Sequence, residues 1–261
     1  MRFREVKILL IISTLAIFSA FTPGEDMRPL MKQVFRKSTW NSMSADMTLT
    51  IIDSRGEKRV REVKFYSKKD KEGNNRMLMR FVRPREVLGT SFLLLEHRNR
   101  DDDRYLYLPA LRRVKRIVAS GKKGNFMSSD FTYYDIGEPK LDDFKYRFLG
   151  EETFRGVKCL KIEATSSSPK VIEETGYSKI IYWVDPDKKI ILKAEYYDER
   201  GKLQKILNIN KHKLINGVYF ATDMVMRDVQ ISHISRIKFS NIKINESIPE
   251  KYFSVKFLRR R

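Results

Sequence analysis

Apolar and polar residues alternate along most of this sequence, and this period of two constrains the possible folds more than any other feature. The clearest case is residues 42–52, where apolar side chains occupy every second position: Met43, Ala45, Met47, Leu49 and Ile51. Successive side chains of an extended chain point to opposite faces of a sheet. The pattern therefore predicts a strand with one buried face and one polar face.

Similar segments recur at intervals of about 10–12 residues, with turn signals between them, as in an antiparallel meander or barrel. They lie at 61–67, 76–82, 91–97, 144–152, 158–164, 178–185, 191–198, 202–210, 219–228 and 234–245. Helical patterns are few. We expect one helix at 27–38, a short one at 129–136 and a single turn at 247–253.

A sheet of this size must bury its apolar face, and the chain has too few helices to cover it. We therefore expect a mainly β fold: a single curved antiparallel sheet forming a half-open barrel, with a few short helices closing its mouth. Inward positions are rich in methionine and aromatic residues, which suit irregular or variable ligands. Either the sheet closes on itself, or it curls around a ligand. No linker interrupts the pattern, which favours one domain over residues 25–261.

The N-terminus has the three-part pattern of a secretory signal. Basic residues at 2–7 precede an uncharged apolar run at 8–20, and residues 21–26 are small, turn-forming and acidic. We expect a signal peptide at 1–24 and export to the periplasm. The apolar run is shorter than the roughly 20 residues that span a bilayer, although a retained anchor remains an alternative. No cysteine follows the run, so we expect no lipid-modified N-terminus.

The chain is strongly basic, with a formal net charge of +20. Such a charge favours an anionic partner, such as lipid headgroups, nucleic acid or an acidic protein surface. Export argues against nucleic acid, and lysine and arginine are spread over the whole chain.

A search for catalytic or metal-binding motifs is negative. The three histidines, His97, His212 and His233, are far apart and lack ligands at metal-site spacing. The chain has no phosphate-binding glycine loop and no nucleophile elbow. Cys159 is the only cysteine, which excludes an internal disulfide. We expect no enzyme activity, no metal and no cofactor.

Residues 104–117, RYLYLPALRRVKRI, form the most distinctive hairpin. The pattern predicts a strand up to Pro109, a turn, and a basic return strand at 112–117. Periodicity alone does not decide which alternate pair faces inward, Tyr105 with Tyr107 or Leu106 with Leu108.

Three segments, at 102–117, 124–136 and 239–258, together resemble the outer-membrane lipoprotein-sorting (LolA-like) proteins of Gram-negative bacteria. The resemblance covers about residues 40–258 and is strongest to the branch found beside RND-type exporters. It implies a half-open β-barrel whose apolar cavity holds acyl chains. It also implies a periplasmic carrier, expected to be a monomer, that takes lipid or lipoprotein from an inner-membrane transporter of the RND or MMPL type.

The resemblance and the inward strand positions together give a set of residues expected to line the cavity. They are Met47, Leu49, Phe65, Met77, Met79, Phe81, Phe92, Leu94, Tyr105, Tyr107, Trp183 and Tyr196. The lid-latching arginine of LolA would fall near residues 71–75, where Arg76 is close.

A lid is expected between Gly121 and Ile136, with glycines as hinges. Its apolar residues are Phe126, Met127, Phe131 and Tyr134, the last three at helical spacing. A loop packed on the sheet is the alternative.

The leading functional hypothesis is a carrier of lipid or lipoprotein acyl chains between the inner and outer membranes. The alternative is a non-catalytic accessory protein of an RND-type exporter that binds the transporter and no lipid. The residues expected to contact a partner or a headgroup are Arg112, Arg113, Lys115 and Arg116. A third hypothesis, a lipid hydrolase or isomerase, would need a buried acid–base pair that the sequence does not indicate.

Overall fold

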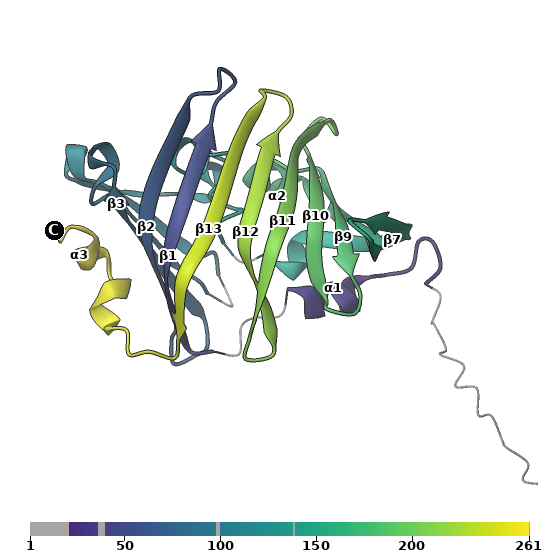
Figure 1. Cartoon of the computed structure of the whole chain (residues 1–261), viewed down its shortest axis with the longest axis horizontal. Helices are drawn as coiled ribbons and strands as arrows, with labels where there is room; N and C mark the ends of the chain where they lie inside the picture. Colours follow the sequence, from purple (N-terminus) through teal and green to yellow (C-terminus); the bar gives the residue numbers. More distant parts are fainter. Residues whose placement is uncertain (1–20, 36–39, 98–99, 138, 261) are drawn as a thin grey trace, which may run out of the picture.

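A computed structural model describes residues 21–35, 40–97, 100–137 and 139–260. Within them, thirteen strands form one antiparallel sheet (Figure 1). The first six are β1 (Ser42–Ile52), β2 (Lys58–Lys69), β3 (Asn75–Arg83), β4 (Ser91–Leu95), β5 (Asp103–Leu108) and β6 (Arg113–Arg116). The other seven are β7 (Phe144–Phe154), β8 (Val157–Ser166), β9 (Lys179–Asp185), β10 (Ile190–Tyr197), β11 (Leu203–Ile215), β12 (Val218–Asp228) and β13 (His233–Ile244).

The sheet is built from two meanders joined through the first and last strands. Its order is β6-β5-β4-β3-β2-β1-β13-β12-β11-β10-β9-β8-β7, so β1 pairs with β13 while β6 and β7 are the two edge strands. Figure 1 shows the sheet curving so that α2 and other connecting segments lie behind its front strands. This confirms the predicted mainly β fold with a curved, open antiparallel sheet.

The alternation in β1 explains how the sheet acquires its two faces. Met47, Leu49 and Ile51 are each no more than 1% exposed, while the residues between them are only half-buried. The register with β2 places Val63 opposite Met47 and Phe65 opposite Ala45, so apolar rows run across neighbouring strands on the concave face. Burial of these rows drives the sheet to curl around its own side chains.

In the described part of the chain, three short α-helices complete the fold: α1 (Arg28–Val34), α2 (Pro169–Thr175) and α3 (Val255–Leu258). Helix α1 is shorter than the predicted 27–38, and residues 36–39 lie outside the described part. The predicted turn near 247–253 is a 3-10 turn at Glu250–Phe253. The predicted helix at 129–136 is wrong: these residues form irregular turns. Most of the predicted signal peptide, residues 1–20, lies outside the described residues.

Apolar side chains gather on both sides of the sheet. The largest cluster fills the concave side and includes α1 and residues of the 119–137 segment. A second cluster lies on the convex side, where Leu78 and Leu93 pack against the C-terminal residues Phe253 and Leu258. Figure 1 shows this C-terminal segment, with α3, beside β2 and β3.

Candidate functional site

A cavity of about 410 Å³ lies on the concave side of the sheet, next to the end of α1. Strands β1, β2, β3, β4, β12 and β13 form most of its wall. Its methionines are Met43, Met47, Met77, Met79 and Met224, and its phenylalanine and tryptophan residues are Phe35, Trp40, Phe65, Phe131, Phe220 and Phe239. The volume lies within the range of about 300–1,000 Å³ that is usual for small-molecule sites.

Few polar side chains reach this wall: Ser67, Asn75, Asp135 and Tyr219. None of the described residues forms a cluster of three or more histidine, cysteine or acidic side chains able to hold a metal ion. A wall of flexible methionines and flat aromatic rings can adapt to an apolar chain of variable shape. The arrangement is therefore suited to holding an apolar ligand without covalent chemistry.

A smaller compartment of about 100 Å³ adjoins the main cavity. The two share the lining residues Phe35, Phe131, Asp135, Gly137, Pro139 and Met224. The compartment lies against β7, β9 and β10, and four tyrosines line it: Tyr134, Tyr146, Tyr182 and Tyr196. Burial raises the pKa of each of these phenols, so all four stay neutral at physiological pH.

Of the twelve residues expected to line the cavity, six lie on a wall of these two spaces: Met47, Phe65, Met77, Met79, Leu94 and Tyr196. Three more, Leu49, Phe81 and Phe92, are buried in the same concave cluster but are not at the cavity wall. The sequence therefore identified much of the concave face, although it did not separate wall from core.

The remaining three residues lie on the convex face, which corrects their expected orientation. Tyr105 and Tyr107 pack against the C-terminal cluster, whereas Leu106 of the same strand belongs to the concave cluster. Trp183 packs with Cys159 and Ile181 in a third cluster, with the Lys193 amino group 4.0 Å from a ring centroid. Trp183 is buried, whereas Tyr105 and Tyr107 are half-buried where the C-terminal residues pack against them.

Sequence reasoning missed the contribution of β12 and of the residues that follow α1. Phe220 and Met224 lie on the cavity wall with Phe35 and Trp40. The alternation of residues 219–228 predicts a strand, but it does not show which face of that strand lines the cavity. Phe35 falls within the helix predicted at 27–38, and Trp40 lies between predicted elements, where no periodicity marks it.

The expected lid residues all lie on the concave side, within an irregular segment. Phe126 is fully buried, and the centroid of its ring lies 6.1 Å from that of Phe81 and 5.3 Å from that of Phe92. Phe131 lines both cavity compartments and Tyr134 lines the smaller one. Met127 has a φ of 50°, a left-handed conformation that is incompatible with a continuous α-helix here.

Two tethers fasten this segment to the sheet. The carboxylate of Asp130 accepts a 2.6 Å hydrogen bond from the hydroxyl of Ser235 on β13, and His233 Nδ1 lies 3.3 Å from its other oxygen. Arg61 on β2 donates a hydrogen bond to the carbonyl of Met127. Arg76, which the sequence placed nearest the LolA latch, instead binds Glu250 of the C-terminal segment at 2.8 Å.

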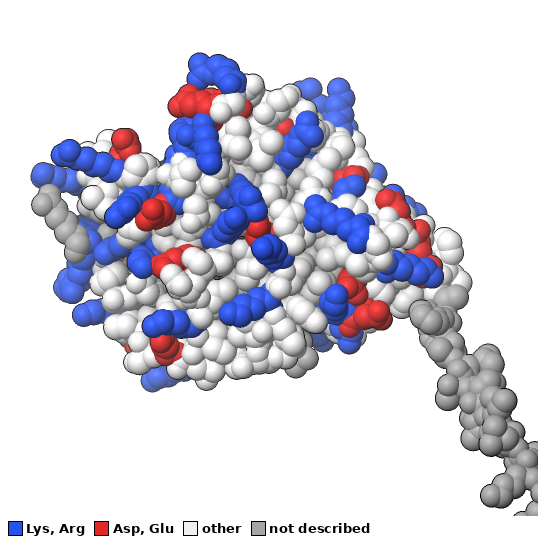
Figure 2. Space-filling model, viewed as in Figure 1, with Lys and Arg blue, Asp and Glu red and all other residues white. Residues whose placement is uncertain are grey.

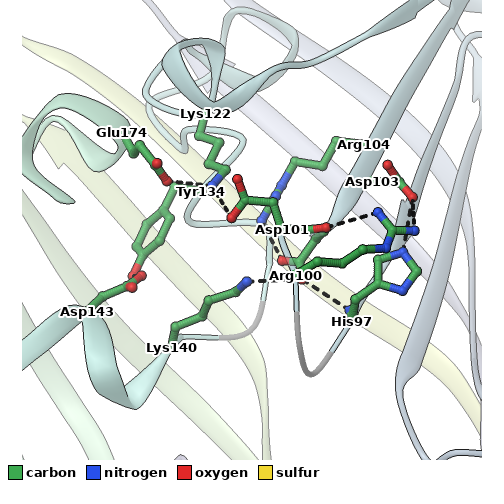
Figure 3. A network of polar contacts seen from close by, with 11 residues as sticks. His97, Arg100, Asp101, Asp103, Arg104, Lys122, Tyr134, Lys140, Asp143 and Glu174 are labelled. Atoms are coloured by element: carbon green, nitrogen blue, oxygen red, sulfur yellow. Dashed lines mark hydrogen bonds and ion pairs between the residues drawn. The ribbon is translucent and has the colours of Figure 1, made fainter. Parts of the chain in front are cut away.

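A network of charges joins the loop before β5 to α2 and to the chain between β6 and β7 (Figure 3). Lys122 lies between Glu174 of α2, at 2.5 Å, and Asp101, at 3.6 Å. Asp102 binds both Lys140, at 3.1 Å, and Arg104, at 3.0 Å. Through Lys122, the network connects the loop before β5 with α2, which belongs to the other half of the sheet, and so helps to hold the curved shape.

Asp103, the first residue of β5, binds residues of the convex side. Arg100 and Arg116 each donate a 2.7 Å hydrogen bond to it, and His97 lies 3.0 Å away. Hydrogen bonding to Arg100, then to Arg116 and His97, holds the pKa of this carboxyl well below its usual range.

The basic residues expected to contact a partner lie at the sheet's edge. Arg113, Lys115 and Arg116 belong to the edge strand β6, and Arg112 precedes it with a φ of 47°. All four are exposed, and Arg116 pairs with Asp103. Figure 2 shows that basic side chains are spread over the convex face, with acidic ones between them. Among the residues that the structure describes, none of the helices combines the length and hydrophobicity of a membrane-spanning segment.

Comparisons with known proteins agree with this architecture. A protein-family profile described as "uncharacterized protein" matches residues 73–260. Curated protein sequences give no match. A crystal structure described as an outer membrane lipoprotein-sorting protein domain, from Vibrio parahaemolyticus, has a TM-score of 0.82 and 28% identity, over 89% of this chain and 98% of that one.

Two further crystal structures cover a similar share of the chain. A DUF1329 family protein from Desulfovibrio piger has a TM-score of 0.82 and 31% identity, over 88% of this chain and 97% of that one. A LolA superfamily protein from Nitrosomonas europaea has a TM-score of 0.68, over 89% of this chain and 99% of that one; its 17% identity speaks for the fold alone. With these matches along most of its length, the chain belongs to the DUF1329 family, like its relative from Desulfovibrio piger, and has the LolA-like fold of the other two structures.

Proposed function

We propose that this protein is a carrier that binds the acyl chains of lipids or lipoproteins in its concave cavity and moves them between the inner and outer membranes. The observation that carries the proposal is the cavity of about 410 Å³, with its methionine and aromatic wall. The relative from Vibrio parahaemolyticus, described as lipoprotein-sorting, supports the same class of cargo. The role is non-catalytic and uses no cofactor.

The energetics of such a cavity suit reversible transfer. Each buried methylene contributes about 0.8 kcal/mol, so a long acyl chain gains considerable binding energy from an apolar wall. Because the interaction is non-directional, chains of different length can bind in the same space. A membrane offers the chain a comparable apolar environment, so release needs no bond cleavage.

We place this activity in the periplasm, with a monomer as the working unit. The proposal rests on the signal-like pattern of residues 1–24 and on the family. A basic convex face would also favour contact with anionic headgroups, by about 1 kcal/mol per well-placed charge near a membrane surface.

Native mass spectrometry and solvent extraction of the protein purified from the periplasm test the proposal. We expect co-purifying lipid or lipoprotein acyl chains. Met224→Trp, which inserts a larger side chain into the cavity, should reduce the amount bound. The control is Val225→Trp, because the adjacent residue on β12 points to the opposite face. An empty cavity in repeated preparations, with no binding of added lipid, would rule the carrier out.

The edge strand β6 favours a second candidate, a non-catalytic accessory protein that binds an RND-type transporter. Its exposed residues Arg113 and Lys115, with Arg112, present positive charge beside an unpaired strand edge. Charge reversal at these three positions should abolish capture of the transporter and leave the lipid content unchanged. A loss of bound lipid would instead assign the edge to the cargo site.

A further inference from the structure

The smaller compartment contains three phenol hydroxyls that the fold does not use. Tyr146, Tyr182 and Tyr196 are 5%, 6% and 8% exposed, and their hydroxyls form no hydrogen bond with any described residue. The hydroxyls of two neighbouring tyrosines, in contrast, do form hydrogen bonds. Tyr134 donates a 2.9 Å bond to Asp143, and Tyr177 donates one of the same length to Asp135. Buried hydroxyls normally form hydrogen bonds. Three tyrosine hydroxyls without a partner around one small space therefore indicate a polar binding subsite.

The strand register explains why there is space in front of these hydroxyls. Tyr146 stands opposite Ala164 on β8, and Tyr182 stands opposite Ala194 on β10. Both alanines are fully buried within the concave cluster. A small side chain beside each large one leaves room that a leucine or isoleucine would fill. The compartment is thus a consequence of the sequence at four positions on neighbouring strands.

The chemistry of the lining selects a neutral oxygen-bearing group. No lysine or arginine lines the compartment among the described residues, so a fully charged anion would lack a counter-ion there. Its one acidic lining residue, Asp135, already accepts hydrogen bonds from Tyr177 and from the Thr132 backbone. Neutral phenols can donate to a carbonyl oxygen and accept from a hydroxyl. An acyl ester, with the adjoining hydroxyls of a glycerol unit, offers these partners.

We propose that the smaller compartment binds the ester and glycerol oxygens of an acylated cargo through the hydroxyls of Tyr146, Tyr182 and Tyr196, while its acyl chain occupies the main cavity. This inference rests on the proposed carrier function and specifies its cargo as an acyl ester. The two spaces lie side by side and share Phe131, Asp135 and Met224 as lining residues, so the proposed cargo would extend past these side chains. Both a diacylglyceryl-modified lipoprotein and a free glycerolipid carry this chemistry.

Displacement of the fluorescent probe N-phenyl-1-naphthylamine from the full-length mature protein tests the proposal. The competitors are monoolein, a dipalmitoylglyceryl-cysteine peptide, and 1-octadecene, which has a chain without ester or hydroxyl. Tyr182→Phe and Tyr196→Phe remove one hydroxyl each and keep the ring. Tyr197→Phe is the control, because its hydroxyl binds Glu195 on the other side of the sheet, at 3.2 Å. Tyr146→Phe serves if either variant fails to fold.

Each lost hydroxyl should weaken binding of an ester probe roughly two- to tenfold, the usual contribution of one neutral hydrogen bond. Binding of 1-octadecene and the behaviour of Tyr197→Phe should not change. A loss confined to the lipopeptide identifies a lipoprotein cargo, and a loss confined to monoolein identifies a free glycerolipid. Equal effects on ester and hydrocarbon, or none on either, overturn this inference and leave the carrier function standing. A wild-type protein that binds none of the probes overturns both.

Discussion

Ser235 on β13 and Asp130 in the 119–137 segment bind each other twice. The Ser235 hydroxyl donates a 2.6 Å hydrogen bond to Asp130 Oδ2, and the backbone N–H of Asp130 donates one of 2.9 Å to the Ser235 Oγ. Both residues are at most 1% exposed. The pair fixes the segment that carries Phe126 and Phe131 against the sheet, and so fixes one wall of the cavity.

Ser235→Ala should lower the free energy of unfolding by about 1–3 kcal/mol, because it leaves the buried Asp130 carboxylate and N–H without this partner. Urea denaturation measures the loss, and hydrogen exchange should show faster opening of residues 126–134. Ser240→Ala is the matched control, since this serine is exposed on the same strand. Equal exchange in the two variants would contradict a tethering role for Ser235.

The same carboxyl should make stability depend on pH. Burial raises the pKa of Asp130 above its usual value of 3.8 and Asp228 adds to the rise, while Ser235, His233 and Lys205 oppose it. A carboxyl whose pKa is higher in the folded than in the unfolded protein binds more protons when folded, within the interval between the two values. Wild-type stability relative to Asp130→Asn should therefore fall as pH rises through that interval, and level off above the raised pKa. Thermal or urea unfolding of both proteins from pH 3 upward checks this. A constant difference, or one that grows with pH, would contradict it.

The strands could be predicted from the sequence because alternation is a local signal. In β1 every inward apolar residue was identified, and its register with β13 closes the two meanders into one sheet. Helix α2 was missed although its signals were present. Ser168 caps its N-terminus, Pro169 begins it, and Gly176 ends it with a φ of 79°. The serine-rich stretch before it looked like a turn alone.

The site was harder to predict because it depends on contacts between distant segments. Periodicity separates Tyr105 from Leu106 but does not say which one faces the cavity. The answer depends on the C-terminal segment, which covers the convex face about 150 residues later and packs against the tyrosines. The failed helix prediction at 129–136 has a similar cause, because the Asp130 tether and the left-handed Met127 replace helical hydrogen bonds.

The C-terminal segment should contribute substantially to stability. Leu258 is fully buried with Leu78 and Leu93, and Arg80 donates a 3.1 Å hydrogen bond to the carbonyl of Phe257. Leu258→Ala should lower the free energy of unfolding by about 2–5 kcal/mol, as large-to-small substitutions in cores do. Arg259→Ala, at the exposed neighbour, should change it by less than about 0.5 kcal/mol. Similar denaturation midpoints for the two variants would show that the segment is not part of the cooperative fold.

Asp102 and Arg104 form the most deeply buried ion pair of the charge network around the loop before β5. Their side chains are 4% and 3% exposed and lie 3.0 Å apart, and Asp102 also accepts from Lys140 at 3.1 Å. The Nε and Nη1 of Arg104 have no hydrogen-bond partner among the described residues. The Asp102 carboxylate is therefore the group that compensates a largely unsatisfied buried cation.

Asp102→Ala should lower the free energy of unfolding by about 3–5 kcal/mol, because it leaves the guanidinium charge buried and uncompensated. Asp101→Ala, at a residue whose side chain is 60% exposed, should have only a small effect. Adding Arg104→Met to Asp102→Ala removes the orphaned charge, so the double variant should recover much of the loss. Urea denaturation of the wild type, Asp102→Ala, Arg104→Met and the double variant gives the coupling energy between the two positions. If the double variant is as unstable as Asp102→Ala, the loss comes from the carboxylate's contacts with Lys140 and the loop, and the charge of Arg104 is not the cause.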